Sequence, residues 1–411
     1  MNKADTGSKT SFFIEREEKY GAHNYHPLPV VLSRGDGVFV WDVEGKQYFD
    51  FLSAYSSVNQ GHCHPKIVAA LFEQSTRLTL TSRAFHNDKL GEYEEMMCRL
   101  FGYDKLLPMN TGVEAVETAI KLARRWGYDK KGIPDGKAKI IVCEGNFHGR
   151  TINVISFSTD PDSNQRFGPY NTGYLIIPYN NTEALSNALK DEHVVGFLVE
   201  PVQGEAGVVI PDEGYLKTAY ELCRKHNVLF IADEIQTGLG RTGTLLACDH
   251  EKIKPDVLIL GKALSGGVLP VSAVLANDDV MLCIKPGEHG STYGGNPLAC
   301  AVAITAMKVL INERLIENAK LLGILLGNFL NDMKSKFSFI TTVRGKGLFH
   351  AMVIKPVEKR NAWEFCLKLM KNGLLAKPTH SDIIRLAPPL VISEPQLKEC
   401  MSIIEMTLND F

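Results

Sequence analysis

The sequence predicts an α/β protein with a large, mostly parallel sheet and a smaller α+β domain. Between residues 90 and 280, short continuous apolar runs alternate with segments of helical periodicity. Continuous apolar strands are buried on both faces, which is typical of parallel sheets built from βαβ units. After residue 300, long helices and alternating strands follow, as in a separate α+β unit.

The large sheet is expected to contain five short apolar strands. These are Lys139–Cys143, Tyr174–Ile177, Gly196–Val199, Val228–Ala232 and Asp256–Leu260. Before them, residues 1–20 read as a polar lead-in, and residues 38–52 alternate around Gly45 as in an antiparallel hairpin. After them, the pattern predicts a long helix over 298–334, strands over 337–343, 347–354 and 383–386, and helices over 361–372 and 394–409.

Length and charge narrow the possibilities. The 411 residues, at about 150 per domain, correspond to two or three domains. We expect an N-terminal segment over 1–60 that contributes to the small domain, a large domain over 61–300 and a C-terminal small α+β domain over 301–411. With 45 basic and 47 acidic residues, the net charge is −2, so no basic field attracts nucleic acid. The longest apolar runs are far too short to span a bilayer. We therefore expect no nucleic-acid partner and no membrane partner.

The cysteines indicate a reducing compartment. Nine of them are scattered through the chain without a Cys-x-x-Cys pair, which favours reduced thiols. The first 20 residues contain Asp5, Glu15, Glu17 and Glu18, whereas transit peptides are poor in acidic residues and rich in arginine. We expect a cytoplasmic protein, and the mitochondrial matrix stays open if the sequence is that of a trimmed form.

Charged residues follow three of the expected strands. Glu200 and Glu205 follow the strand Gly196–Val199, Asp233 follows Val228–Ala232, and Lys262 follows Asp256–Leu260. Ligands of open parallel sheets bind at the carboxyl ends of the strands, so these residues predict a cleft with opposed charges. A lysine amine desolvated by apolar neighbours has a lowered pKa and can attack a carbonyl. Pyridoxal phosphate uses such a lysine, with an acid on its pyridine nitrogen. Taken alone, Lys262 could also be a lysine that reaches solvent, and Asp233 an aspartate that caps a turn.

A further motif points to a phosphate. Thr111 and Glu114 have the spacing of a capping box and mark the start of an amphipathic helix. Gly112 lets backbone amides approach an anion closely, and the helix dipole favours a phosphate there. Many helices begin in this way, so the motif gains weight only through its combination with Lys262 and Asp233.

Together these motifs resemble the signature of the class III pyridoxal-phosphate aminotransferases. The string Leu229–Gly238 (LFIADEIQTG), followed by Gly261–Gly267 (GKALSGG), carries the resemblance, and the distance from Asp233 to Lys262 fits the family. Within the family, the chain is similar to the members that act on ornithine, from about Tyr20 to the C-terminus. The other matching strings are Tyr20–Pro29 (YGAHNYHPLP), Asn59–Pro65 (NQGHCHP), Thr79–Phe85 (TLTSRAF), Pro108–Glu114 (PMNTGVE), Glu200–Val208, Gly290–Pro297 (GSTYGGNP) and Leu374–Leu390.

The resemblance implies the aspartate-aminotransferase-like fold (fold type I) and pyridoxal 5′-phosphate as the cofactor. Lys262 would bind the cofactor covalently and shuttle the proton, and Asp233 would pair with the pyridine nitrogen. The other implied cofactor contacts are Gln236, Phe147, the backbone amides of Gly112 and Val113, and Thr292, which would reach the phosphate of a neighbouring subunit. The chain departs from many members at His148, where they have a second aromatic residue beside the stacking phenylalanine.

The resemblance also implies the substrates. The δ-amino group of L-ornithine would pass to 2-oxoglutarate, giving glutamate and glutamate 5-semialdehyde, which cyclises to pyrroline-5-carboxylate. Arg150 would hold the α-carboxylate, and Tyr25 and Tyr55 would meet the α-amino end. Glu205 would pair with Arg385 while ornithine is bound and release it for the carboxylate of 2-oxoglutarate. The role of Thr292 requires a homodimer with shared sites, and a higher oligomer stays open.

Three other functions are compatible with the same motifs. They are a related aminotransferase that uses N-acetylornithine or 4-aminobutyrate, an enzyme that moves an amine within one substrate, and a non-catalytic protein that kept the fold. The two tyrosines and Glu205 argue against the first, and the retained lysine and aspartate argue against the last. His62-Cys63-His64 lacks further ligands at zinc-like spacing, so we expect no metal site. Arg344–Gly347 lacks the Ser or Thr of a phosphate loop and is expected to be a turn between strands.

Overall fold

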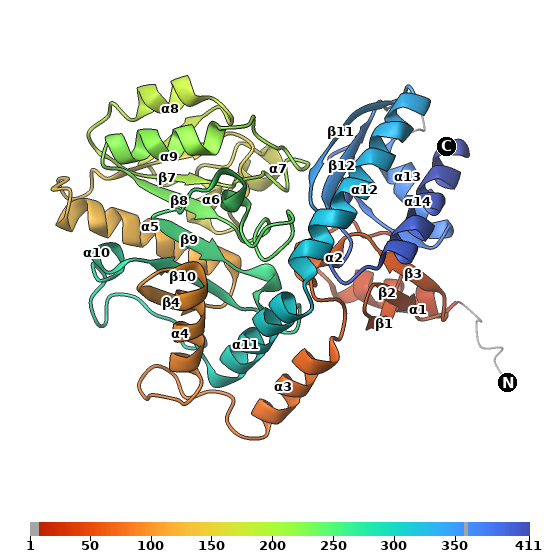
Figure 1. Ribbon diagram of the computed structural model, residues 1–411, viewed down its shortest axis with the longest axis horizontal. Coiled ribbons are helices and arrows are strands. Elements are labelled where there is room, and N and C mark those ends of the chain that lie inside the picture. The colour runs from red at the N-terminus through yellow and green to blue at the C-terminus, as the bar shows by residue number, and fades with distance from the viewer. Residues whose placement is uncertain (1–7, 357–360) are drawn as a thin grey trace.

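The computed structural model describes residues 8–356 and 361–411. Figure 1 shows two lobes, one built on a seven-stranded sheet and the other on two four-stranded sheets. In the part of the chain that is described, no helix combines the length and the apolar character needed to cross a membrane.

The seven-stranded sheet has the order β4-β10-β9-β8-β7-β5-β6. Its strands are β4 (Lys105–Met109), β5 (Lys139–Cys143), β6 (Tyr174–Ile177), β7 (Val194–Val199), β8 (Leu229–Asp233), β9 (Val257–Leu260) and β10 (Ser272–Ala276). The five predicted strands are confirmed, and their neighbours pair in parallel. Two further strands were not predicted, β4 and β10. They pair antiparallel with each other, and β10 also pairs antiparallel with β9. β4 lies at the edge of the sheet, where Pro108 is tolerated.

Both faces of this sheet are buried, as continuous apolar strands require. Alternate residues of each strand point to opposite faces. Phe197 and Phe230 belong to one core cluster, and Leu198 and Ile231 belong to the other. The second cluster also contains the apolar face of α5 (Gly112–Asp129), the amphipathic helix that the capping-box motif predicted. The sheet therefore provides a rigid platform for residues at its strand ends.

A small sheet joins the N-terminal segment to the C-terminal part of the chain. Its order is β1-β2-β3-β13, with β1 (Leu32–Asp36), β2 (Phe39–Asp42), β3 (Gln47–Asp50) and β13 (Leu374–Leu375). The predicted hairpin is confirmed as β2 and β3, and β13 pairs in parallel with β3. Residues 9–20 of the expected polar lead-in are exposed and form α1 (Lys9–Tyr20), a helix that was not predicted, with Ser8 as its N-cap. No residue of α1 is buried, so the sequence lacks the apolar stripe from which this helix could have been predicted.

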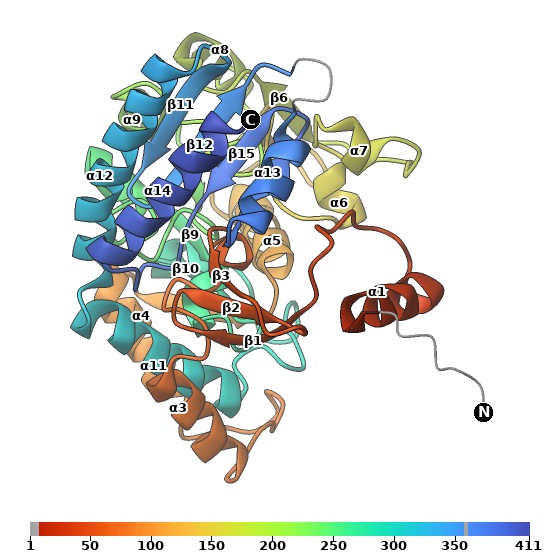
Figure 2. The same ribbon diagram turned by 90° about the vertical axis from the view of Figure 1, so that its right-hand side faces the viewer.

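The third sheet has the order β11-β12-β15-β14, with β11 (Ile340–Lys346), β12 (Phe349–Ile354), β14 (Lys377–Thr379) and β15 (Ile383–Leu386). The helices α12 (Leu315–Lys336), α13 (Ala362–Lys371) and α14 (Glu394–Asn409) lie side by side over this sheet (Figure 2). The single helix predicted over 298–334 is wrong: α11 (Pro297–Asn312) and α12 are separated at Arg314, whose φ is 54°. Of the turn predicted over Arg344–Gly347, only Gly347 lies between β11 and β12, because Arg344–Lys346 continue β11 and pair with β12.

The remaining elements are short or peripheral. They are α2 (Ser53–Ser56), α3 (Pro65–Ser75), α4 (Leu90–Phe101), α6 (Ile152–Ile155), α7 (Pro161–Asn164), α8 (Thr182–Ala188), α9 (Tyr215–Lys225), α10 (Asp278–Met281) and the 3₁₀ helices η1 (Ala247–Glu251) and η2 (Lys262–Ser265). Of these, α2 and η2 carry residues that matter for the candidate site.

Candidate active site

Charged side chains lie together at the carboxyl ends of three adjacent parallel strands. Glu200 directly follows β7, Asp233 is the last residue of β8, and Lys262 comes two residues after β9. β8 pairs with both β7 and β9. Glu200 and Asp233 are buried, and the charges of both carboxylates act on the Lys262 amine. The structure thus brings together the lysine and the carboxylates that the strand-end argument predicted.

Asp233 is held by two hydrogen bonds. Its Oδ2 accepts from Nδ1 of His148 at 2.7 Å, and its Oδ1 accepts from the backbone N–H of Ile235 at 3.1 Å. The His148 side chain is 0% exposed and that of Asp233 5%. Burial lowers the pKa of His148, but the hydrogen bond and charge of Asp233 raise it, and the net pKa lies above the ordinary value. The raised pKa favours the imidazolium form of His148, whose Nδ1–H donates to Asp233.

Lys262 has an unusual backbone and an unusual amine. Its φ is 43°, in the left-handed region that residues with a side chain seldom adopt. Burial lowers the pKa of the Lys262 amine, and the pKa stays lowered although Glu205 and Asp233 act in the opposite direction. A lowered pKa increases the fraction of neutral amine, which is the nucleophilic form. Backbone strain of this kind is found at functional sites.

Glu200 supports the neighbouring loop. Its Oε1 accepts from the backbone N–H of Phe147 at 2.8 Å. Burial raises the pKa of Glu200 to about 7, with His148 lowering it and Asp233 raising it. At neutral pH this carboxyl is therefore partly protonated. The sequence analysis placed Glu200 at the strand end but gave it no role.

The N-terminus of α5 presents free backbone amides. Thr111 and Glu114 form the predicted reciprocal capping box: Thr111 Oγ1 accepts from the Glu114 N–H, and Glu114 Oε2 accepts from the Thr111 N–H. Within the described residues, the N–H groups of Gly112 and Val113 have no partner. A pocket of about 370 Å³ lies beside them, lined by Ser57, Asn110, Thr111, Gly112, Lys262, Ser265, Gly267, Val268, Leu269, Pro270 and Val271. An anion on the helix N-terminus would thus share this pocket with Lys262.

The loop over residues 145–150 packs against that helix end. Gly149 has a φ of 126°, and a Cβ at this position would come within 2.4 Å of Cγ2 of Val113. The close contact sets the position of Phe147, which is half-buried, and of Arg150, whose guanidinium lies 5.4 Å from the centre of the Phe147 ring. A side chain at residue 149 would push the loop away from the helix.

Opposite this loop, Glu205 and Arg385 form an ion pair. Nη1 of Arg385 lies 2.6 Å from Oε1 of Glu205, and the Arg385 side chain is buried. Burial raises the pKa of Glu205, but Arg385, Lys262 and the hydrogen bonds lower it, so the net pKa is below the ordinary value. Nε2 of Gln236 lies 3.3 Å from both Glu205 Oε1 and the backbone oxygen of Tyr55. The Tyr55 ring faces the Arg385 guanidinium at 5.0 Å.

Three of the predicted site residues lie at exposed positions. Tyr25 is 73% exposed, with Nζ of Lys377 5.5 Å from its ring centre. Thr292 lies on an exposed loop and does not line the pocket beside α5, although the neighbouring Ser291 accepts a hydrogen bond from Asn110 at 2.8 Å. Arg150 is exposed as well. The structure does not bring Tyr25 or Thr292 into contact with the buried residues around Lys262.

The histidines around Cys63 have other partners. His62 Nε2 bonds Asp50 and His64 Nε2 bonds Glu313. In the described ranges, no three His, Cys, Asp or Glu residues are placed to hold a metal ion.

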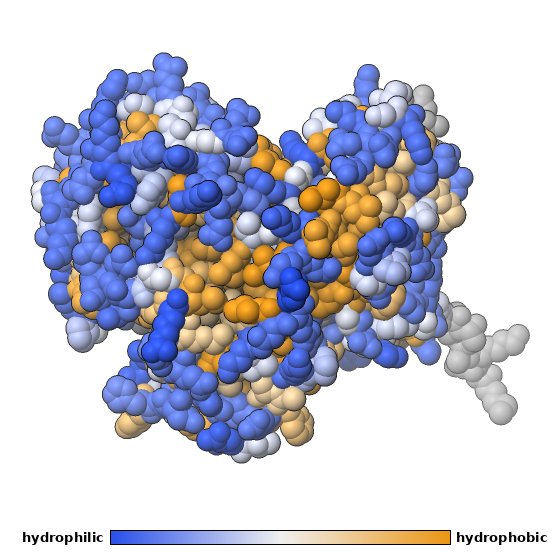
Figure 3. Space-filling view, viewed as in Figure 1, coloured by the Kyte–Doolittle hydropathy of each residue, from blue (hydrophilic) through white to orange (hydrophobic). Residues whose placement is uncertain are grey.

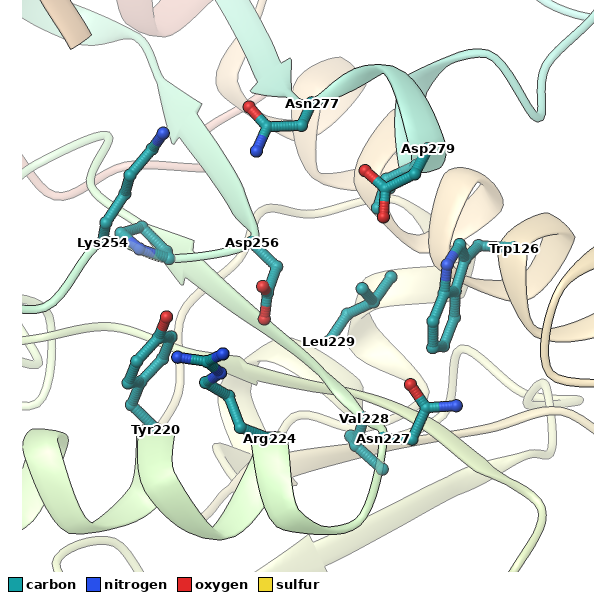
Figure 4. Close-up of a pocket in the computed structure, with 12 residues that line it drawn as sticks. Trp126, Tyr220, Arg224, Asn227, Val228, Leu229, Lys254, Asp256, Asn277 and Asp279 are labelled. Carbon is teal, nitrogen blue, oxygen red and sulfur yellow. The ribbon is translucent and has the colours of Figure 1, made fainter. Parts of the chain in front are cut away.

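A second pocket lies at the other end of the same strands (Figure 4). It has about 370 Å³ and is lined by Trp126, Tyr220, Arg224, Asn227, Val228, Leu229, Lys254, Pro255, Asp256, Asn277, Asp279 and Val280. Val228 and Leu229 stand at the start of β8, and Pro255 and Asp256 precede β9. Ligands of parallel sheets bind at the carboxyl ends, so the pocket beside Lys262 is the candidate active site.

Comparison with known proteins decides the family. The model of the family Aminotransferase class-III matches residues 20–408. The chain belongs to the class III aminotransferases. Ornithine aminotransferase, mitochondrial, of Drosophila melanogaster is 63% identical over 405 residues, which cover 98% of this chain and 93% of the relative.

Solved structures of class III aminotransferases share the fold. The ornithine aminotransferase from Toxoplasma gondii ME49 has a TM-score of 0.96 at 47% identity and covers 98% of this chain and 96% of its own. Acetylornithine aminotransferase from Elizabethkingia anophelis has a TM-score of 0.90 at 58% identity and covers 98% of this chain and 99% of its own. The predicted fold type I architecture is confirmed. This class III aminotransferase is a transaminase with pyridoxal 5′-phosphate as its cofactor.

The residues of this class III aminotransferase fit that cofactor. A buried amine of lowered pKa at Lys262 and the free amide of Gly112 line one cavity, and the Asp233 carboxyl lies at the end of the neighbouring strand β8. These are the groups that a carbonyl, a protonated pyridine nitrogen and a phosphate require. The direct contact of His148 with Asp233 was not foreseen. Since residues 148 and 233 are far apart in sequence, no local pattern could have revealed it.

Proposed function

We propose that this class III aminotransferase is an ornithine δ-aminotransferase. It transfers the δ-amino group of L-ornithine to 2-oxoglutarate, giving glutamate and glutamate 5-semialdehyde, which cyclises to pyrroline-5-carboxylate. The observation that carries the proposal is the 2.6 Å ion pair between Glu205 and Arg385, beside Tyr55. One pocket has to accept a donor with two amino groups and then a dicarboxylate. An arginine that is neutralised for the first substrate and released for the second meets both needs.

The proposed roles at the centre of the site follow from charge and burial. When bound, pyridoxal phosphate supplies an electron sink for the carbanion that develops at the δ-carbon. Lys262 would hold the cofactor covalently, and its amine would move the proton at the δ-carbon, for which its lowered pKa suits it. Asp233, oriented by His148, keeps the pyridine nitrogen protonated. Phe147 would stack on the ring, Gln236 would bond its hydroxyl side, and the amides of Gly112 and Val113 would hold the phosphate.

The proposed substrate contacts lie on both sides of that centre. Arg150 binds the α-carboxylate of ornithine, and Tyr25 and Tyr55 meet its α-amino end. Arg385, released from Glu205, binds a carboxylate of 2-oxoglutarate. Tyr25 and Arg150 are exposed, so we propose that they act at the rim of the site, where a substrate would enter.

We also propose a homodimer in which Thr292 reaches the phosphate of the other subunit. Two observations support this arrangement. Thr292 is exposed, and the adjacent Ser291 bonds Asn110, which lies close in sequence to the Gly112 and Val113 amides proposed to hold the phosphate. Figure 3 shows apolar residues gathered across the middle of one face. Large apolar side chains of the segment 65–85 are also exposed, namely Val68, Phe72, Leu78 and Phe85. Exposed apolar area of this extent is typical of protein interfaces.

The domain limits and the compartment remain proposals. The pairing of β13 with β3 supports an N-terminal segment over 1–60 that joins the C-terminal domain over 301–411, with the large domain over 61–300. For the compartment, we propose one that keeps thiols reduced, the cytoplasm or the mitochondrial matrix. All nine cysteines are unpaired in the structure, which supports this choice.

A second candidate donor is N-acetylornithine, since the Elizabethkingia anophelis enzyme named for it is 58% identical. To distinguish the two functions, kcat/KM is measured for L-ornithine, N-acetylornithine and 4-aminobutyrate. Each assay contains 2-oxoglutarate and the cofactor-loaded protein. We expect L-ornithine to exceed both others by at least about 10-fold, the discrimination that a few contacts can give. A preference for N-acetylornithine would replace the proposal with the second candidate, and no turnover with any donor would reject both.

A further inference from the structure

Tyr55 lies in a left-handed helical turn. The φ angles of Ser53, Ala54, Tyr55 and Ser56 are 51°, 46°, 59° and 70°, and the ψ angles of Ala54 and Tyr55 are 50° and 43°. Residues with a side chain visit this region singly, because their Cβ crowds the following carbonyl oxygen. Four consecutive residues without a glycine therefore need other contacts to hold them.

The carboxylate of Asp50 provides these contacts. Its Oδ1 accepts from the backbone N–H of Leu52 at 2.8 Å and from that of Ser53 at 2.9 Å. Its Oδ2 accepts from Nε2 of His62 at 2.7 Å. Asp50 is 8% exposed, so these bonds face little competition from water. Asp50 thus fixes the backbone at the point where the turn begins.

The turn is also tied to the strand that carries Arg385. Oγ of Ser53 donates to the backbone oxygen of Ala387 at 2.7 Å, and the N–H of Ala387 donates to the backbone oxygen of Phe51 at 2.8 Å. Arg385 lies two residues before Ala387. The same turn places the Tyr55 ring 5.0 Å from the Arg385 guanidinium. A change in the turn would therefore move Tyr55 relative to Arg385.

We propose that Asp50 is a positioning residue for donor selection: by holding the left-handed turn over Ser53–Ser56, it sets the distance between Tyr55 and the Glu205–Arg385 pair. The inference rests on the proposed function, in which this side of the pocket distinguishes ornithine from donors with a terminal carboxylate. Asp50 touches no substrate atom and acts through Tyr55. Its loss should alter KM and donor preference more than the chemistry at Lys262.

The chain offers a matched control in Asp42. Its Oδ1 also accepts from two backbone N–H groups, those of Glu44 at 3.0 Å and Lys46 at 2.8 Å. Its Oδ2 also accepts from a side chain, Tyr48 OH, at 2.7 Å. Asp42 is 9% exposed and belongs to the same sheet, but the turn that it holds joins β2 to β3. Asp50→Ala and Asp42→Ala therefore remove equivalent sets of hydrogen bonds. Only Asp50→Ala removes the bonds that hold the turn of Tyr55.

The test compares kcat and KM for L-ornithine and 4-aminobutyrate in the wild-type holoenzyme and both variants. For Asp50→Ala we expect the ornithine preference to narrow by about 10-fold, mainly through KM, with the absorption of the bound cofactor unchanged. For Asp42→Ala we expect a lower Tm and an unchanged preference. Asp50→Asn, whose amide oxygen can accept the same two N–H groups, should recover most of the preference. A wild-type preference in Asp50→Ala, or an equal narrowing in Asp42→Ala, would overturn the proposal.

Ser53→Ala keeps the test decisive if Asp50→Ala does not fold. It removes only the bond to Ala387, and we expect the preference to narrow by about 3-fold, the loss of one ordinary hydrogen bond. An unchanged preference in Ser53→Ala would then overturn the proposal. A failure of the proposed function would be seen separately, because the wild-type enzyme itself would then show no preference for L-ornithine.

Discussion

Nδ1 of His148 lies 2.7 Å from Oδ2 of Asp233 in the candidate active site, and both side chains are buried. The hydrogen bond and the charge of Asp233 raise the pKa of His148 against the opposing effect of burial. Nε2 of His148 has no partner among the described residues, so the histidine is held mainly by this carboxylate. His148 thus contributes directly to the electrostatics of the site.

Replacing Lys262 by alanine should abolish turnover. The variant loses the buried amine that binds the cofactor and moves the proton, and we expect kcat to fall by at least about 1,000-fold, within the range for a positioned acid–base group. Steady-state kcat with L-ornithine and 2-oxoglutarate checks this, together with the visible spectrum of the loaded protein. Lys398→Ala, at an exposed lysine paired with Glu394 on α14, is the control and should behave as wild type. Normal turnover in Lys262→Ala would remove this lysine from the mechanism.

Glu205→Gln should change the donor preference. Without the carboxylate, Arg385 loses the partner at 2.6 Å that neutralises it and can bind a carboxylate of the donor. We expect kcat/KM for 4-aminobutyrate to rise relative to that for ornithine by about 10-fold, the scale of one charge-assisted bond. Glu213→Gln, at an exposed glutamate, is the control. An unchanged ratio would show that the ion pair does not select the donor.

Glu200 should make the stability of the cofactor-free protein depend on pH. Its pKa is about 7 in the folded protein and near the ordinary value of 4.5 in the unfolded chain. Between these values the folded state binds more protons, so the free energy of unfolding falls as pH rises through this window. Glu200→Gln removes the titration and still accepts from the Phe147 N–H. From pH 5 to pH 8, we expect the free energy of unfolding, measured with urea, to fall by about 1–3 kcal/mol more in the wild type than in Glu200→Gln. Parallel pH profiles for the variant and wild type would contradict the raised pKa.

Gly149→Ala should displace the loop that carries Phe147. A Cβ at residue 149 meets Cγ2 of Val113 at 2.4 Å, and the φ of 126° is unfavourable for alanine. We expect a destabilisation of more than about 2 kcal/mol and a weaker hold on pyridoxal phosphate, measured by thermal unfolding and cofactor titration. In Gly132→Ala, the φ is 76° but no atom lies within 4 Å, so we expect a cost of about 1 kcal/mol and unchanged cofactor binding. Equal effects of both variants would mean that backbone conformation, and not contact with Val113, explains the result.

The sequence predicted what local patterns encode. The five apolar strands, the hairpin at residues 38–52 and the cap at Thr111 depend on neighbouring residues, and the structure has all of them. Asp233 and Lys262 could be placed together because parallel strands carry their carboxyl ends to one edge. The edge strand β4 was missed because Pro108 interrupts its pattern, and α1 because it buries no side chain.

Contacts between distant segments could not be predicted in the same way. The bond of His148 to Asp233 joins residues 85 positions apart, and the bond of Ser53 to Ala387 joins residues 334 positions apart. The left-handed turn at Tyr55 contains no glycine, so the usual sequence signal for positive φ is absent. The break between α11 and α12 could not be predicted for the same reason, because the residue with a positive φ, Arg314 at 54°, is not a glycine.

Transfer of the δ-nitrogen is the central claim, and isotope labelling tests it most directly. The loaded enzyme is incubated with 2-oxoglutarate and L-ornithine that carries ¹⁵N at either the δ- or the α-position, and the glutamate formed is analysed by mass spectrometry. The account predicts labelled glutamate from δ-labelled ornithine and unlabelled glutamate from the α-labelled donor. Label from the α-position, or no glutamate from either donor, would contradict it.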